Sequence, residues 1–132
     1  MEQVADIIIY GGSSGGVVAG IQAARMKKSV VIIEPGRRIG GLTTGGLGAT
    51  DIGNKAAIGG IAREFYQRIK KYYGEPANWK WRKPEPHEAD APVRASKADE
   101  AMWTFEPSAA WIVITDMLAE ARAPVVYGER LD

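Results

Sequence analysis

The sequence predicts an α/β protein with a doubly wound parallel sheet, on three observations. Two short β-branched apolar runs, residues 6–10 and 30–33, flank a segment with helical periodicity. A cluster of glycines fills the turn between the first run and that helix. A further apolar triplet, residues 125–127, follows a second helical segment. A strand, a crossover helix and a parallel strand form the βαβ unit from which such sheets are built.

The first strand and its turn lie in residues 5–20, ADIIIYGGSSGGVVAG. The apolar run is nearly continuous, which is typical of a parallel strand that is covered on both faces. Five glycines follow within residues 11–20, and from Gly15 onward Val17 and Ile21 recur at helical spacing. The cations of residues 25–28 stand where the helix dipole favours positive charge, so the helix is predicted to end there.

Glu34 directly follows the second strand and stands eighteen residues beyond Gly16. A glycine-rich strand-to-helix turn with an acid about twenty residues later is the dinucleotide-binding fingerprint. Gly11 permits the tight turn and Gly16 permits close helix–strand packing, while Ser13 occupies the middle position where glycine is commoner. The helix N-terminus then faces phosphates.

Glu34 would bind a ribose hydroxyl and repel a 2′-phosphate, which disfavours NADP. Replacing Glu34 with Ala is expected to weaken binding of the adenosine half and to spare the fold. A purely structural tight turn is the alternative.

The stretch after Glu34, residues 35–60, holds nine of the sixteen glycines. We expect an extended loop whose main-chain N–H groups serve a long dinucleotide beyond the first helix, because glycines let the backbone approach a ligand closely. A flexible surface loop is the alternative.

Two motifs carry a resemblance to a known family. Residues 10–13 read Tyr-Gly-Gly-Ser, and residues 38–41 read Arg-Ile-Gly-Gly. The sequence thereby resembles the FAD-dependent oxidoreductases of the glutathione-reductase-like superfamily, in the group where Tyr-Gly-Gly-(Thr/Ser) replaces the commoner Gly-x-Gly turn. The resemblance covers residues up to about 60 strongly and the remainder loosely.

The resemblance implies a Rossmann-like FAD/NAD(P)-binding domain, FAD as cofactor and a small molecule as substrate. Residues 1–132 would form the N-terminal part of that domain, with an irregular excursion at about residues 75–104. No catalytic residue and no metal ligand can be named, because flavin chemistry belongs to the cofactor. The expected cofactor-binding residues are Gly11, Gly12, Ser13, Ser14, Gly15, Gly16, Glu34, Pro35, Arg38, Gly40, Gly41, Leu42 and Thr43.

The later segments predict two more helices and a strand. Residues 61–74 form an amphipathic pattern with Ile61, Phe65, Ile69 and Tyr72 or Tyr73 on one face. Residues 107–123 form a helix that begins at a proline and stops before another one. Its run at residues 111–114, WIVI, is apolar all round, so this helix is either sandwiched or missing a partner. Residues 125–127 supply the third parallel strand.

Composition disfavours several function classes. Seventeen basic and sixteen acidic residues give a net charge of +1, which offers no footprint for nucleic acid or an anionic membrane. Trp79 and Trp81 alternate with cations, but nearby acids cancel that charge and favour a solvated loop with anchoring aromatics.

His87 is the only histidine and is not expected to act as a base. The sequence contains no cysteine and no apolar run of membrane-spanning length, so we expect a cytoplasmic protein.

Two alternatives stay open: an NAD-binding dehydrogenase domain, and a nucleotide-binding module without catalysis. The second glycine stretch disfavours the first of these. Only three parallel strands are credible, whereas the doubly wound fold continues beyond them. We therefore expect a missing C-terminal portion of the chain, an unpaired sheet edge, and no turnover by this chain alone.

Overall fold

The computed structural model describes residues 4–51, 53–81 and 100–131. Its centre is a parallel sheet of three strands, β1 (Ile7–Tyr10), β2 (Val30–Glu34) and β3 (Val125–Tyr127), in the order β1-β2-β3. Ile8 of β1 pairs with Val31, and β2 pairs in turn with β3. The three predicted strands and their parallel arrangement are confirmed.

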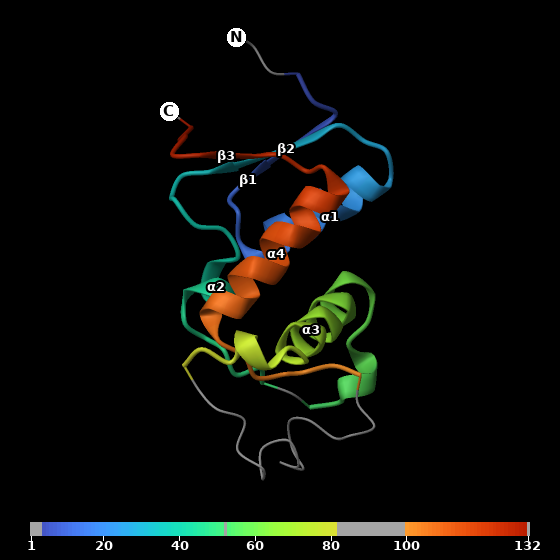
Figure 1. The fold of residues 1–132 in the computed structure, drawn as a ribbon. Helices are drawn as coiled ribbons and strands as arrows, with labels where there is room; N and C mark the ends of the chain where they lie inside the picture. Colours follow the sequence, from blue (N-terminus) through green and yellow to red (C-terminus); the bar gives the residue numbers. More distant parts are fainter. Residues whose placement is uncertain (1–3, 52, 82–99, 132) are drawn as a thin grey trace.

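Three long helices accompany the sheet: α1 (Ser14–Arg25), α3 (Gly60–Tyr73) and α4 (Pro107–Ala121). Figure 1 shows α1 and α4 on the same side of the sheet and α3 farther from the strands. The short elements are α2 (Gly41–Gly45), η1 (Lys55–Ala57) and η2 (Pro76–Asn78). The βαβ unit formed by β1, α1 and β2 is the one that the sequence predicts.

The hydrophobic core lies between the sheet and the helices. Ile32 of β2 packs there with Val17 and Ile21 of α1, and all three are almost fully buried. The alternate side chains of β1 face the other way: Ile8 is 58% exposed and Tyr10 is 48% exposed. The prediction that β1 is covered on both faces is therefore wrong within the described residues, because the described helices supply cover for one face only.

Helix α4 is packed along one side, while Trp111 and Ile112 of its all-apolar run stay half-exposed, so the described residues do not sandwich the whole run. It contacts α1, α2 and α3, and Val113 and Ile114 are buried between these neighbours. In α3, the buried face contains Ile61, Phe65, Ile69 and Tyr73. The pattern left Tyr72 and Tyr73 open, and Tyr73 is the one that enters the core.

A chain of ion pairs links the same three helices. Arg25 of α1 bonds Glu64 of α3 at 2.6 Å, and Arg68 bonds both Glu64, at 2.9 Å, and Glu120 of α4, at 2.6 Å. The bond from Arg25 holds the pKa of Glu64 below its ordinary value. This network fixes the position of α3 relative to α1 and α4.

The excursion at about residues 75–104 is described only at its two ends. The indole N–H of Trp79 donates to the carbonyl of Tyr73 at 2.8 Å, so this tryptophan is an anchor, whereas Trp81 is 84% exposed. An antiparallel bridge joins Ala49 to Thr104. His87 lies outside the described residues.

Candidate functional site

The turn between β1 and α1 depends on glycine at two positions. Gly11 has a φ of +100°, a conformation that is strained for any residue with a side chain. A Cβ atom at Gly16 would overlap the carbonyl oxygen of Gly11. The start of α1 therefore lies directly on the end of β1, which is the packing that the fingerprint requires.

The N-terminus of α1 is capped by Ser13, whose hydroxyl oxygen accepts the N–H of Gly16 at 3.3 Å. The N–H groups of Ser14 and Gly15 stand in the first turn, where no intrahelical carbonyl can receive them. Together with the helix dipole, these donors favour an anion at this end of α1. The serine at the middle fingerprint position thus has a structural role and still keeps its own proton to donate.

Glu34 ties the end of β2 to this turn. One carboxylate oxygen accepts the N–H of Gly12 at 2.7 Å, and the other accepts the N–H of Gly36 at 2.7 Å. The side chain is only half-buried, and a carboxylate accepts about four hydrogen bonds, so capacity is left for a ligand hydroxyl. The acid stands beside the glycine turn, as the fingerprint predicts.

Tyr127 of β3 is a neighbour of Glu34 that sequence reasoning missed. The two residues are paired across the sheet, and Gly128 donates its N–H to the carbonyl of Glu34 at 2.7 Å. Burial, followed by the charge of Glu34, raises the pKa of the Tyr127 phenol above its ordinary value. This neighbour follows from the position of β3 beside β2, and no local pattern around Tyr127 indicates it.

The second glycine stretch is bound to the first by three hydrogen bonds. Gly40 donates its N–H to the carbonyl of Gly12 at 2.6 Å. The Ser14 hydroxyl donates to the carbonyl of Gly40 at 2.8 Å and lies 2.8 Å from the Thr43 hydroxyl oxygen. We call residues 11–16 and 40–43 together the cradle. Small hydroxyl residues inside both glycine stretches were the signal available in the sequence, but their pairing was not predicted.

The expectation of an extended loop after Glu34 is wrong in one part. Residues 41–45 form the short helix α2, and the Thr44 hydroxyl donates to the carbonyl of Ile39. This buried bond and the packing of α2 on α4 stabilise a helical turn despite its glycines.

Among the described residues, no hydrogen bond joins three of the expected contact residues to the turn before α1. The Arg38 guanidinium lies 4.8 Å above the ring of Trp111 and donates to the carbonyl of Pro107, so it is directed to α4. Leu42 is 71% exposed, and Pro35 is half-buried beside Glu34. The other expected residues are Gly11, Gly12, Ser13, Ser14, Gly15, Gly16, Glu34, Gly40, Gly41 and Thr43, and they gather around the start of α1.

The residues present fit a diphosphate-containing ligand. A side chain at Gly12 would collide with Ile39 and with Glu34, so only glycine fits there, and the first-turn N–H groups of Ser14 and Gly15 are the donors that can serve an anion. In the described ranges, no group of three or more His, Cys, Asp or Glu residues could hold a metal ion. No helix among these residues is long and apolar enough to cross a membrane.

Comparison with known proteins gives a family and a fold. The family model described as FAD dependent oxidoreductase matches residues 6–132. No curated protein matches the chain. THI4 from Thermovibrio ammonificans is similar in structure, with 21% identity, a TM-score of 0.51, and coverage of 94% of this chain and 38% of that one.

Two further structures are similar at lower identity. L-amino acid deaminase from Proteus vulgaris has 13% identity and a TM-score of 0.53, with 97% of this chain and 45% of that one covered. The 3-ketosteroid-delta4-(5alpha)-dehydrogenase from Rhodococcus jostii RHA1 has 16% identity and a TM-score of 0.50, with 96% and 38% covered. At these identities the likeness concerns the fold, and the chain spans less than half the length of each structure.

Proposed function

The chain belongs to the FAD-dependent oxidoreductase family, whose cofactor is FAD, and we propose that the cradle is the part of this chain that binds it. The first-turn amides of α1 would hold the diphosphate, and Glu34 would accept a ribose hydroxyl. Gly40, Gly41, Leu42 and Thr43 would contact the cofactor beyond the diphosphate. When bound, FAD supplies the capacity to accept and donate a hydride.

The observation that carries this proposal is the pair of bonds from the Ser14 hydroxyl. These bonds, to the carbonyl of Gly40 and the hydroxyl of Thr43, join the two glycine stretches into one surface at the start of α1. A shorter nucleotide would need only the first stretch. A second stretch held against the first one supports a ligand that extends past the diphosphate, and this favours FAD over NAD.

The substrate is proposed only as a small molecule, and no catalytic residue is proposed. The similar structures bear the names of a deaminase and a dehydrogenase, which indicates that this fold accommodates different substrates. A cytoplasmic location stays a prediction.

We further propose that this chain by itself does not turn over a substrate. Two features support this: the outer face of β1, which no described element covers, and the small share of each similar structure that the chain spans. A parallel sheet of this kind needs helices or further chain over both faces.

Ser14→Ala tests the role of the cradle. Without the hydroxyl, the second stretch loses both bonds to α1, so we expect FAD binding to weaken at least about tenfold, which corresponds to about 1.4 kcal/mol, the size of a single net hydrogen bond. Ser29→Ala is the matched control, because Ser29 bonds Asp6 before β1, at the opposite end of the sheet. Fluorescence titration with FAD measures both variants. Equal weakening in both variants, or none in Ser14→Ala, would contradict the proposal.

A further inference from the structure

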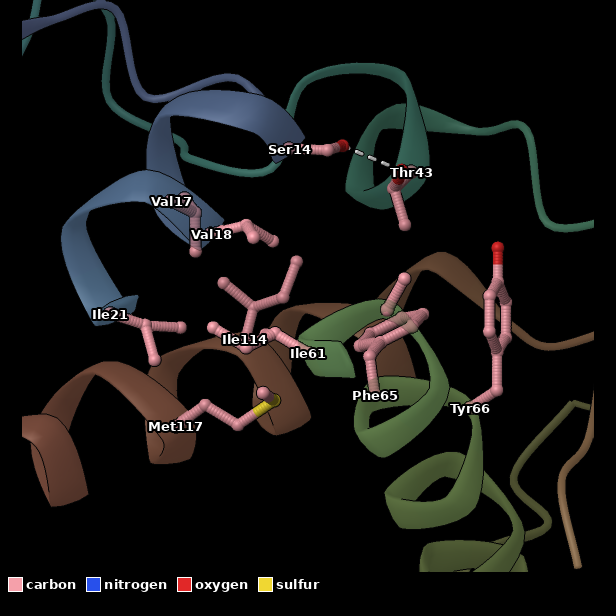
Figure 2. A pocket seen from close by; sticks show the side chains of 11 residues that line it. Ser14, Val17, Val18, Ile21, Thr43, Ile61, Phe65, Tyr66, Ile114 and Met117 are labelled. Carbon is pink, nitrogen blue, oxygen red and sulfur yellow. Dashed lines mark hydrogen bonds between the residues drawn. The ribbon is translucent and has the colours of Figure 1, made fainter. Parts of the chain in front are cut away.

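A pocket of about 110 Å³ lies below the cradle, between α1, α3 and α4. Figure 2 shows side chains from these three helices converging on it, with Ser14 and Thr43 above. Its floor is apolar and buried: Val17 and Ile21 come from α1, Phe65 from α3, and Met117 from α4. Apolar cavities of this kind do not hold ordered water well, because water needs polar partners.

The rim of the pocket carries three hydroxyl groups and no charge. The Ser14 hydroxyl gives its proton to the carbonyl of Gly40, so the Ser14–Thr43 pair presents lone pairs that can accept. The Tyr66 hydroxyl accepts from Thr50 at 3.2 Å and keeps its own proton to donate. No Asp, Glu, His, Lys or Arg is among the residues that line the pocket, so a charged group would enter without a counter-charge.

Two of the residues that line the pocket are exposed, and we infer from their exposure that they mark its mouth. Ala62 of α3 is exposed, and Val18 of α1 is 36% exposed. The small alanine leaves the entrance open, whereas a larger residue there would close it without touching the buried floor.

We propose that this pocket is a second binding site, which takes a small neutral molecule with an apolar ring or branched alkyl group and one hydroxyl. A buried cavity of about 150 Å³ with a similar lining binds benzene. A ring of that size fits the present pocket because the open mouth lets part of the ligand protrude. The hydroxyl would face the Ser14–Thr43 pair and Tyr66. Ser14 and Thr43 belong to both the cradle and the pocket, but binding here needs no flavin, so a titration without flavin tests this inference separately from the proposed function.

Methyl NMR of the full chain, titrated with benzyl alcohol, tests the inference. The methyl groups of Ile21, Ile61, Ile114 and Met117 line the pocket and should shift in a saturable manner. The methyls of Val125, which does not line it, should stay in place. Absent, non-saturable or uniform shifts would overturn the proposal.

Two comparisons sharpen the test. Benzylamine, which has nearly the same shape but is charged at neutral pH, should bind at least about tenfold more weakly, because the pocket offers no counter-charge. Ala62→Leu should weaken the binding of benzyl alcohol at least about tenfold, because the larger side chain would fill the mouth and packed side chains leave no spare volume. Ala19→Leu places the same side chain on an exposed part of α1 and should change nothing. The proposal would be overturned if benzylamine bound as tightly as benzyl alcohol, or if the Ala62→Leu protein bound benzyl alcohol as tightly as the wild type. Val18→Phe closes the same mouth from α1 if the first variant fails to fold.

Discussion

Glu34→Ala should destabilise the fold as well as weaken nucleotide binding. From the sequence, Glu34 was expected to serve the ligand and to be dispensable for the fold. In the structure its carboxylate accepts two backbone N–H groups, from Gly12 and Gly36, and so holds the end of β2 against the turn before α1.

The magnitude follows from the burial of the two donors. The residue Gly12 is buried, and leaving its N–H without a partner costs about 1–3 kcal/mol. Gly36 is exposed, so water can replace the lost acceptor at a net cost of about 0.5–1.5 kcal/mol. The sum is roughly 1.5–4.5 kcal/mol, which corresponds to a fall in melting temperature on the order of 10 °C for a domain of this size.

Thermal melts by circular dichroism, with and without ADP, measure both effects. We expect Glu34→Ala to melt well below the wild type in the absence of ligand, and ADP to raise its melting temperature less than it raises that of the wild type. Glu129→Ala is the control, because Glu129 is an exposed acid beyond β3. An unchanged melting temperature in Glu34→Ala would refute the role of its two hydrogen bonds, and an unchanged ADP effect would remove Glu34 from the binding site.

Three further predictions concern the turn, the ion pairs and the bare face. Gly16→Val should lower the melting temperature far more than Ser13→Gly, because a side chain at Gly16 meets the carbonyl of Gly11, whereas Ser13→Gly loses only a cap worth a few tenths of a kcal/mol. Similar melts for the two variants would contradict the packing described. Glu64→Gln should lower the free energy of unfolding by about 1 kcal/mol at pH 7. Arg25 lowers the folded-state pKa of Glu64, so this stabilisation is complete above the ordinary value of 4.5 and is lost as the pH falls through the lowered pKa. The difference in melting temperature between the two proteins should shrink as the pH is lowered from 7 into the acid range below 4.5, and a difference that stays constant over this range would contradict the role of the ion pair. Ile8→Lys should keep the chain monomeric to higher concentration, with a change in stability within about 0.5 kcal/mol, since this side chain is 58% exposed. Light scattering measures the association state of both proteins. A wild type that is already monomeric at high concentration would contradict the idea that the exposed face of β1 is an association surface.

The sequence was sufficient for the elements whose signal is local. The strands around Ile8 and Ile32 are marked by β-branched runs, and the buried face of α3 is marked by helical spacing. The turn before α1 was predictable because the φ of Gly11 and the close approach at Gly16 can be met only by glycine. These constraints act within a few residues and so leave a trace in the sequence.

The features that were missed depend on contacts between distant segments. The Ser14–Thr43 pair joins residues twenty-nine positions apart, and nothing in either stretch alone indicates it. The contact of the Arg38 guanidinium with the ring of Trp111 on α4 also joins distant segments, and the motif around Arg38 does not indicate it. Helix α2 was read as loop because of its glycines, although packing against α4 outweighs their low helix propensity.

Calorimetric titration of the purified chain with FAD, ADP, NAD and riboflavin tests the central claim most directly. The account predicts one FAD per chain, competition by ADP because both use the first turn of α1, weaker binding of NAD, and no competition by riboflavin, which lacks the diphosphate. Gly16→Val, if it folds, should abolish the FAD signal. A chain that binds NAD more tightly than FAD, or that binds riboflavin as well as FAD, would contradict the assignment of the cradle as an FAD site.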